Sequence, residues 1–498
     1  MIYNNPVIKG FYPDPSVCKV NGKYYLVCSS FQYFPGVPLF ESQDLINWRQ
    51  IGYCLTRKSQ INLDNINSSG GIFAPTIRYN NGRFYMTTTN NATNQNFYVW
   101  TDDIYGEWSD PIYVDQGGID PSLYFEEDKT YFMSNGIDEY GVNGIVQCEI
   151  DIENGKKLTP SLTIWTGSGG RFLEGPHMYK INKKYYLVAA EGGTEFGHMV
   201  TYARGDSPYG KFESYNNNPV LTNRNLGGYE IQGVGHGDLI QDNDGNWWFI
   251  HLGFRQSGQW EAYHHLGREV FLTPITFGED GWFTAGYNGT TIKSFNINNI
   301  DKNIIQNEKK YYTFENTEWD KDWCYLRIPY SQNYKFNENR LLLKGTDITL
   351  DDLDSPTFIG LRQRDFNATI SCDICISDGE SGITLYMDEN HHYDLAIRRS
   401  EKGYEVIKRL NIGDVKSVEK TIYLDNKNSV SLVINASNTY YSFFIKSEDE
   451  EIYMGKAKSK YLSSEVAGGF TGVIIGLYSY ASRDCDYSEF TNFKCMYS

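Results

Sequence analysis

The sequence predicts an all-β protein in which a five-bladed β-propeller is followed by a β-sandwich. A hairpin pattern recurs five times in the first part of the chain, and short strands with polar turns fill the last part. Aromatic residues are also abundant, with 40 Tyr, 27 Phe and 10 Trp in 498 residues. Aromatic residues favour strands, and a repeat of several short strands over about 40 to 50 residues is typical of propeller blades.

The propeller is predicted from the repeated hairpin. Each copy has a turn, a polar or basic residue and two positions that are mostly aromatic, and the copies are NGKYYLV, NGRFYMT, EDKTYFM, NKKYYLV and DGNWWFI. The second of these positions holds Tyr25, Tyr85, Tyr131, Tyr186 and Trp248. Tight turns between such strands indicate hairpins. Because further short strands follow each copy, we expect five blades of about four strands.

The domain boundaries follow from the end of this repeat. Residues 1–295 are expected to form the propeller, 296–310 an Asn- and Lys-rich linker, and 311–498 the sandwich, where segments such as ATISCDICISD and VSLVINAS read as strands. Cys372 and Cys375 form a C-x-x-C without a second pair at zinc spacing, so they are predicted to be core cysteines. His391 and His392 are interpreted as surface turn residues rather than metal ligands.

Charge and hydropathy exclude several classes of partner. With 45 basic and 62 acidic side chains the formal charge is −17, so a nucleic-acid partner is not expected. No run of 18 apolar residues occurs, so no membrane partner is expected either. The start MIYNNPVIKG lacks signal-peptide features, and the nine cysteines suit a reduced core, so the interpretation is a cytoplasmic protein. A homo-oligomer is compatible with these features.

The repeat also aligns one position in each of the five units, at the entrance of the unit's first strand. Eleven or twelve residues before each hairpin aromatic stand Asp14, Ala74, Asp120, Glu174 and His236. The innermost strands of a propeller surround its central channel, so these side chains should converge there. A ring of this kind could hold Ca²⁺, which prefers oxygen ligands, although EF-hand spacing is absent. The other interpretation is catalysis.

Converging carboxylates in unlike environments are the machinery of glycoside hydrolysis. One carboxylic acid donates a proton to the leaving oxygen, while a second carboxylate activates water or attacks the anomeric carbon. A third carboxylate nearby raises the pKa of the donor by repulsion. Aromatic rings in SSFQYFPG and GGIFAPT would provide an apolar surface for a sugar ring.

An ordered set of motifs carries a family resemblance: NPVIKGFYPDPSV, SGGIFAPTIRY, GGIDPSLYF, FLEGPHMYK, EGGTEFGHM, GVGHGDL and HHLGREVFL. The chain resembles glycoside hydrolase family 43, the five-bladed β-xylosidases and α-L-arabinofuranosidases that carry a C-terminal β-sandwich. The resemblance implies an inverting, exo-acting enzyme that needs no cofactor and releases D-xylose from the non-reducing ends of xylo-oligosaccharides. The expectation includes α-L-arabinofuranosidase activity in the same enzyme. The alternative is an enzyme that acts mainly on α-L-arabinofuranosides of arabino-oligosaccharides derived from arabinoxylan.

The resemblance also implies a role for each matching residue. Asp14 would be the general base, Glu174 the general acid, and Asp120 the residue that orients Glu174 and raises its pKa. His236 would lie on the channel floor and hold water or a structural calcium ion. Arg268 would bind a sugar hydroxyl and pair with the carboxylates. Residues expected to line or rim the sugar pocket are Phe31, Phe73, Ala74 and Thr194. Many members have Trp where Phe73 stands, which leaves the sugar preference open.

Two rival functions and one open role remain at this stage. A noncatalytic carbohydrate-binding propeller would be expected to lack one of the three acids, and a calcium-dependent phosphoesterase would need more His or Asp ligands. The sandwich is either a sugar-binding module or a structural flank with a loop over the active site. Phe470 and Tyr478 are the candidates for substrate contact in that domain.

Overall fold

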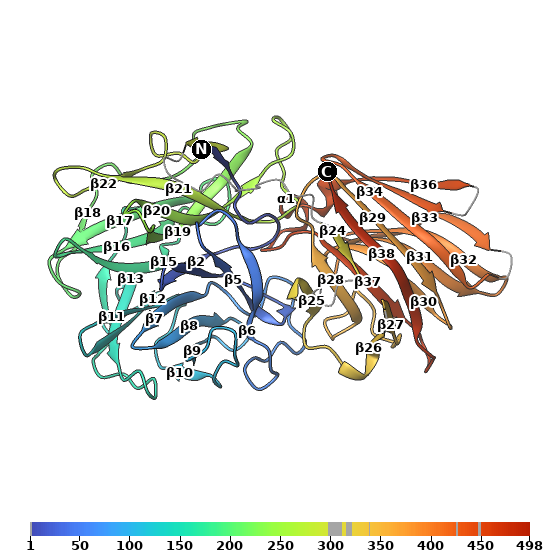
Figure 1. The fold of residues 1–498 in the computed structure, drawn as a ribbon, viewed down its shortest axis with the longest axis horizontal. Coiled ribbons are helices and arrows are strands. Elements are labelled where there is room, and N and C mark those ends of the chain that lie inside the picture. The colour runs from blue at the N-terminus through green and yellow to red at the C-terminus, as the bar shows by residue number, and fades with distance from the viewer. Residues whose placement is uncertain (1, 297–310, 315–320, 338, 425–426, 447–449) are drawn as a thin grey trace.

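The computed structural model describes all residues except 1, 297–310, 315–320, 338, 425–426 and 447–449. Figure 1 shows a propeller, coloured blue to yellow-green, beside a β-sandwich, coloured orange to red. The described residues are almost entirely strands and loops, and the helical segments are short: η2 (Ser331–Asn333), η3 (Ser459–Leu462) and α1 (Ser464–Ala467). The predicted all-β fold with five blades and a sandwich is confirmed.

Each blade is a four-stranded antiparallel sheet formed by one continuous stretch of chain. Blade 1 contains β2 (Ser16–Val20), β3 (Lys23–Val27), β5 (Gly36–Ser42) and β6 (Arg49–Leu55). Blade 2 contains β7 (Thr76–Asn80), β8 (Arg83–Asn90), β9 (Gln95–Thr101) and β10 (Ile112–Val114). Blade 3 contains β11 (Ile119–Glu126), β12 (Lys129–Ile137), β13 (Asn143–Ile150) and β14 (Leu162–Trp165).

The last two blades follow the same order. Blade 4 contains β15 (Glu174–Ile181), β16 (Lys184–Glu191), β17 (Met199–Gly205) and β18 (Glu213–Ser214). Blade 5 contains β19 (Ile231–Gln241), β20 (Trp247–Arg255), β21 (Glu269–Phe277) and β22 (Phe283–Ala285). The innermost strands β2, β7, β11, β15 and β19 contact one another in a closed ring. Equivalent positions of the repeat therefore face the same channel.

The propeller core is divided into layers between neighbouring blades. Tyr25 packs with residues of blade 2, Tyr85 with blade 3, and Trp248 with blade 1. Tyr186 lies in the layer between blades 4 and 5. The hairpin aromatics are thus mainly structural, because each fills the space between two twisted sheets.

A buried ionic network joins the innermost strands of four blades. The Asp238 carboxylate on β19 accepts hydrogen bonds from Ser16 Oγ at 2.6 Å and Val17 N at 3.0 Å on β2. It also pairs with Arg78 Nη1 on β7 at 2.8 Å and accepts the hydroxyl of Tyr179 on β15. Burial would raise the pKa of Asp238, but Arg78 and these hydrogen bonds outweigh it and hold the pKa below the ordinary value.

The ends of the propeller segment are joined by β1 (Ile2–Asn4) and β23 (Ser294–Asn296), which pair antiparallel. The linker predicted at 296–310 lies, apart from its first residue, outside the described residues. The domain boundaries therefore stay predictions. No helix among the described residues is long and apolar enough to cross a membrane.

The sandwich consists of two large antiparallel sheets that enclose one apolar core. One sheet contains β24 (Tyr311–Thr313), β26 (Tyr334–Asn337), β27 (Arg340–Leu343), β29 (Ala368–Cys375), β34 (Ser429–Ala436), β35 (Tyr440–Lys446), β36 (Glu451–Lys458) and β38 (Ser488–Tyr497). The other contains β25 (Trp323–Leu326), β28 (Thr357–Arg362), β30 (Glu380–Asp388), β31 (His391–Ser400), β32 (Gly403–Ile412), β33 (Val415–Leu424) and β37 (Ile474–Tyr480).

The two domains share a sheet at their junction. The propeller strand β4 (Tyr33–Phe34) pairs with β25 and becomes the edge strand of the second sandwich sheet. Arg327, which is fully buried, donates from Nε to Ile66 O in the propeller at 2.8 Å and from Nη1 to Asp354 O in the sandwich at 2.9 Å. The sandwich is therefore fixed directly against the propeller (Figure 1).

The structure tests two predictions about residues of the sandwich, one for its cysteines and one for its histidines. All nine cysteines are free, and Cys372 is buried within β29 as predicted, while its neighbour in the motif, Cys375, is partly buried. The interpretation of His391 and His392 as surface residues is wrong, because both begin β31 and are buried. Their rings contact the carboxylates of Asp388 and of Asp351 and Asp394, which compensates the burial of the imidazoles.

Candidate active site

Three of the five aligned entrance positions share an unusual backbone geometry. Asp14, Asp120 and His236 have φ values of 56°, 55° and 47°, a region that residues other than glycine seldom occupy. The register shifts at these points in β11, β15 and β19 mark β-bulges. A bulge redirects side chains locally, and such strain is concentrated at functional sites. The repeated geometry thus presents these side chains to the channel.

Asp14 is held as a carboxylate. Its Oδ1 accepts a hydrogen bond from Arg268 Nη1 at 2.7 Å, and its Oδ2 accepts one from Ser29 Oγ at 2.6 Å. Burial raises the pKa of Asp14, but Arg268, His236 and Ser29 together outweigh this and place the pKa below the ordinary value. Asp14 is therefore ionised at neutral pH and can accept a proton.

Glu174 has the opposite character. It begins β15, and burial together with the Asp14 carboxylate raises the pKa of Glu174 to about 7, although Arg268 lowers it. A substantial fraction of Glu174 therefore carries a proton at neutral pH. Two carboxyl groups whose environments separate their pKa values in this way are suited to act as base and acid.

Asp120 is joined to the segment that carries Glu174. Its Oδ2 accepts a hydrogen bond from Gly175 N at 3.1 Å, which fixes the backbone directly after Glu174. Gly175 has φ 58°, and a Cβ there would lie 2.9 Å from the His236 ring, so the position requires glycine. Burial and the Glu174 carboxylate raise the pKa of Asp120 well above its ordinary value. The two acids repel each other, and their titration belongs to the pair.

His236 lies beside Asp120, with Nδ1 4.0 Å from Asp120 Oδ2. Burial lowers the pKa of His236, so the ring is neutral at neutral pH. The described residues contain no group of three His, Cys, Asp or Glu side chains that could hold a metal ion. Since Ca²⁺ takes six to eight oxygen ligands, these side chains do not fit a protein-coordinated calcium ion. An ion held mainly through water stays a prediction.

Arg268 connects the carboxylates to the rim of the site. Its Nη1 contacts both Asp14 and Thr194 Oγ1, the latter at 2.9 Å. Its Nη2 is buried without a hydrogen-bond partner among the described residues. A buried guanidinium nitrogen without an acceptor is unfavourable, so it is available to a ligand oxygen. This arrangement agrees with the predicted pairing of Arg268 with a catalytic carboxylate.

An aromatic wall stands next to these groups. Phe31 lies 5.5 Å from Phe73 and 5.7 Å from Phe470, measured between ring centroids, and Phe31 and Phe470 are stacked. The Arg268 guanidinium lies over both Phe31 and Phe470, at 5.7 Å and 5.3 Å. Ala74 is buried next to Phe73. The structure thus brings the predicted pocket residues together and adds Phe470 from the sandwich.

A cavity of about 500 Å³ opens between the domains at this wall. Its lining includes Arg268 and Thr194 from the propeller and Phe470 and Glu465 from the sandwich. Glu465 receives the backbone N–H of His264 at 2.9 Å and contacts His264 Nδ1 at 2.7 Å. The sandwich therefore completes one side of the pocket.

Sequence reasoning missed three parts of this site. Ser29, the second donor to Asp14, gave no signal because serine is common near turns. The His264–Glu465 contact joins positions about 200 residues apart with no repeat to align them. The Asp238 network was accessible, because Asp238 follows His236 by two residues and strand residues two apart share a face.

Both domains of the chain match known family models, and relatives of the whole chain are known. Residues 3–283 match the model of the glycosyl hydrolases family 43, and residues 311–495 match the β-xylosidase C-terminal concanavalin A-like domain. The non-reducing end α-L-arabinofuranosidase of Bacteroides ovatus is 36% identical over 99% of this chain and 95% of its own length. A xylosidase/arabinosidase of Butyrivibrio fibrisolvens is 35% identical over 99% of both chains.

Solved structures give the same result. A family 43 protein of Bacteroides ovatus, described with a xyloglucan locus, has a TM-score of 0.94 at 35% identity and covers 100% of both chains. A xylan β-1,4-xylosidase of Bacillus halodurans has a TM-score of 0.90 at 28% identity, again over 100% of both chains. The resemblance seen in the motifs is confirmed over both domains. The chain therefore belongs to glycosyl hydrolases family 43 and is a glycosidase.

Proposed function

We propose that the protein is an exo-acting, inverting glycosidase that removes one pentose from the non-reducing end of an oligosaccharide. The main substrate is a β-1,4-xylo-oligosaccharide, from which D-xylose is released, and α-L-arabinofuranosides are a second substrate of the same pocket. This proposal rests on two carboxyl groups with different pKa values. The pKa of Asp14 is lowered, so it is ionised, and the pKa of Glu174 is raised to about 7. No cofactor takes part in the scheme.

The chemistry requires two proton transfers. Asp14 accepts a proton from a water molecule as the water oxygen attacks the anomeric carbon. The bond from that carbon to the glycosidic oxygen breaks, and Glu174 donates its proton to the departing oxygen. Water then ends on the face opposite the leaving group, which inverts the configuration. Asp120 holds the backbone after Glu174 and keeps the acid in position.

The shape of the pocket supports exo action on a neutral sugar. Phe470 from the sandwich stacks on Phe31 and extends the aromatic wall on that side, and a pocket bounded by both domains favours binding of a chain end. The rings give an apolar surface for the C–H face of one sugar, and Arg268 Nη2 provides a free donor for a hydroxyl.

The second candidate function is mainly α-L-arabinofuranosidase activity. It is favoured by the names of two full-length relatives, one an arabinofuranosidase and the other a xylosidase/arabinosidase. Phe73 offers a smaller ring than the Trp expected at this position, so the wall leaves more room for a furanose. Both candidates use the same acid and base.

The test compares p-nitrophenyl β-D-xyloside with p-nitrophenyl α-L-arabinofuranoside for the wild type, Glu174→Ala and the exposed control Glu213→Ala. We expect Glu174→Ala to lose most of its activity on xylobiose and less on the two p-nitrophenyl substrates, whose leaving group needs little protonation, and we expect the control to keep its activity on all of them. The ratio of the two wild-type rates decides between the candidates. Proton NMR of the first product formed from xylobiose reads the anomeric configuration, and retention of the β-anomer would contradict the assigned roles.

A further inference from the structure

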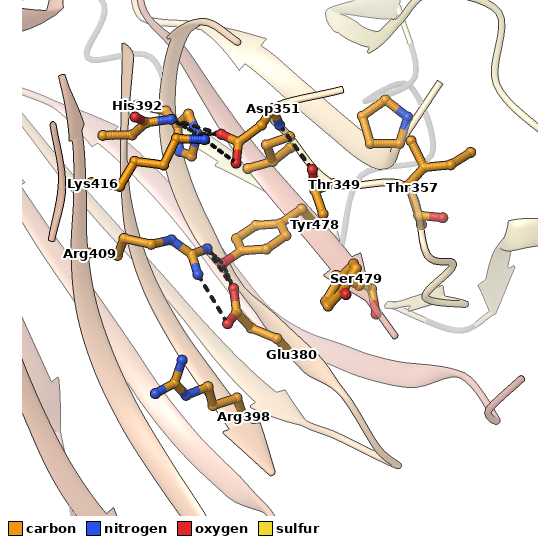
Figure 2. Close-up of a pocket in the computed structure, with 15 residues that line it drawn as sticks. Thr349, Asp351, Thr357, Glu380, His392, Arg398, Arg409, Lys416, Tyr478 and Ser479 are labelled. Atoms are coloured by element: carbon orange, nitrogen blue, oxygen red, sulfur yellow. Dashed lines mark hydrogen bonds and ion pairs between the residues drawn. The ribbon is translucent and has the colours of Figure 1, made fainter. Parts of the chain in front are cut away.

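A second pocket lies in the sandwich, apart from the carboxylate site (Figure 2). It is a cavity of about 370 Å³ between strands β30, β31, β32 and β37 and the segment 348–357. This volume falls in the range of about 300 to 1,000 Å³ that is typical of small-molecule sites. The residues predicted for catalysis do not line it.

The polar lining follows from strand alternation. On β31, Tyr393, Leu395 and Ile397 point into the core between the two sheets. Their neighbours His392 and Arg398 line the pocket on the opposite face. Many charged side chains are buried on this sheet face. Each of these charges must therefore be compensated by an opposite charge in the pocket or by a ligand.

Each cation of the lining has an anionic partner. Arg409 Nη2 contacts Glu380 Oε1 at 2.6 Å, and Arg409 also contacts Asp394 Oδ2 at 2.8 Å. Lys416 Nζ contacts Asp351 Oδ2 at 2.9 Å. Figure 2 shows Arg409 and Glu380 on one side of Tyr478 and the Asp351 group on another.

Two further pairs complete the compensation. Arg398 contacts Glu405 at 2.7 Å. His392 contacts Asp394 and Asp351, both at 2.9 Å, and although burial opposes it, these carboxylates raise the pKa of His392 to about 9. The lining therefore has no uncompensated charge to attract an ion, and an uncharged polar ligand suits it best.

The pocket also offers apolar surface and fixed polar groups. The ring of Tyr478 and the side chains of Leu350 and Pro356 form part of its wall. Asn411, which is almost completely buried, donates from Nδ2 to Asp351 Oδ1 at 2.7 Å. This hydrogen bond helps to fix the Asp351 carboxylate, whose oxygens are acceptors at the edge of the pocket.

We propose that this pocket is a second carbohydrate-binding site that holds one residue of a neutral oligosaccharide. A sugar combines an apolar C–H face with hydroxyls at its edge, which matches the Tyr478 wall and the fixed donors and acceptors around it. Arg398 and Lys416 stand at the rim, with side chains 34% and 52% exposed. The site would keep a chain near the catalytic domain without taking part in bond cleavage.

The test measures xylotriose binding by isothermal titration calorimetry to the full chain carrying Glu174→Gln, which slows turnover about 10²- to 10⁴-fold. We expect two binding events per chain. Adding Arg398→Ala and Lys416→Ala should weaken one event at least tenfold and leave the other unchanged. Arg399→Ala is the matched control, because Arg399 is exposed on the same strand and does not line the pocket.

The possible results separate this site from the active site. A single event that the rim variants do not weaken would overturn the proposal, as would two events that both survive them. Binding only of xylotriose with a glucuronic acid branch would also overturn it, since it would indicate an anion site. In the otherwise wild-type chain, Arg398→Ala should leave p-nitrophenyl xyloside hydrolysis unchanged, so a failure of the proposed function is seen separately.

Discussion

Replacing Arg268 with alanine removes the guanidinium that donates to Asp14 Oδ1 at 2.7 Å. A hydrogen bond to a charged group contributes about 1.5–3 kcal/mol. With about 1.4 kcal/mol for each pKa unit, the pKa of Asp14 should rise by about one to two units. The pKa of Glu174 should rise as well, because Arg268 lowers it in the wild type. The whole pH profile should therefore move upward.

The assay is the pH dependence of kcat/KM on p-nitrophenyl β-D-xyloside from about pH 3 to about pH 9, which spans the ordinary carboxyl and histidine range. In the wild type we expect activity to fall at high pH as Glu174 loses its proton, and at low pH as Asp14 gains one. The Arg268→Ala variant should move both limbs to higher pH.

Ser29→Ala provides a graded comparison, because Ser29 donates a hydrogen bond from an uncharged hydroxyl to the other oxygen of Asp14. It removes a hydrogen bond but no positive charge, so the acid limb should shift upward by less than in Arg268→Ala. An acid limb that stays in place in Arg268→Ala, or moves to lower pH, would refute the assignment of Asp14 as the base.

Three other changes test separate parts of the structure. Glu174→Gln should reduce hydrolysis of xylobiose about 10²- to 10⁴-fold but affect p-nitrophenyl xyloside less, since p-nitrophenolate needs little protonation; equal losses would argue against an acid role. Phe470→Ala should raise KM for xylobiose several-fold, because a wall ring that stacks on Phe31 is lost; an unchanged KM would place the sugar elsewhere. Asp238→Asn should destabilise the protein by about 3–5 kcal/mol, because Arg78 is left buried without its anion. In the wild type that contribution is present above about pH 4 and declines at lower pH as Asp238 is protonated, so thermal unfolding of the variant should depend less on acid.

The propeller and its three acids could be predicted because the chain repeats itself. Asp14, Asp120 and Glu174 stand at one position of that repeat, and closed blades bring such positions to a common axis. The causes of the pKa shifts of these acids were harder to predict from the sequence. Asp120 was expected to raise the pKa of Glu174, but the sequence did not predict that burial is the first cause of the raised pKa at both acids. Burial depth depends on packing that motifs do not describe.

The sequence predicted that the second domain is a β-sandwich, but it did not predict which residues of the sandwich are exposed. Its strands follow from alternation, yet alternation does not reveal which face another element covers. His392 was interpreted as exposed for this reason, although the segment around Asp351 covers it. Phe470 was a candidate only because of the family resemblance, and it reaches the pocket because the two domains pack together.

The shared sheet at the junction has a consequence for how substrate enters. Because Tyr33 and Phe34 pair with β25, any hinge motion between the domains would break hydrogen bonds of a continuous sheet. The hydrogen bonds that Arg327 donates to Ile66 O and Asp354 O would have to break as well. Substrate must therefore enter, and product must leave, while the domains stay together. The cavity between the domains is then present before substrate binds, so binding requires no closure of one domain onto the other.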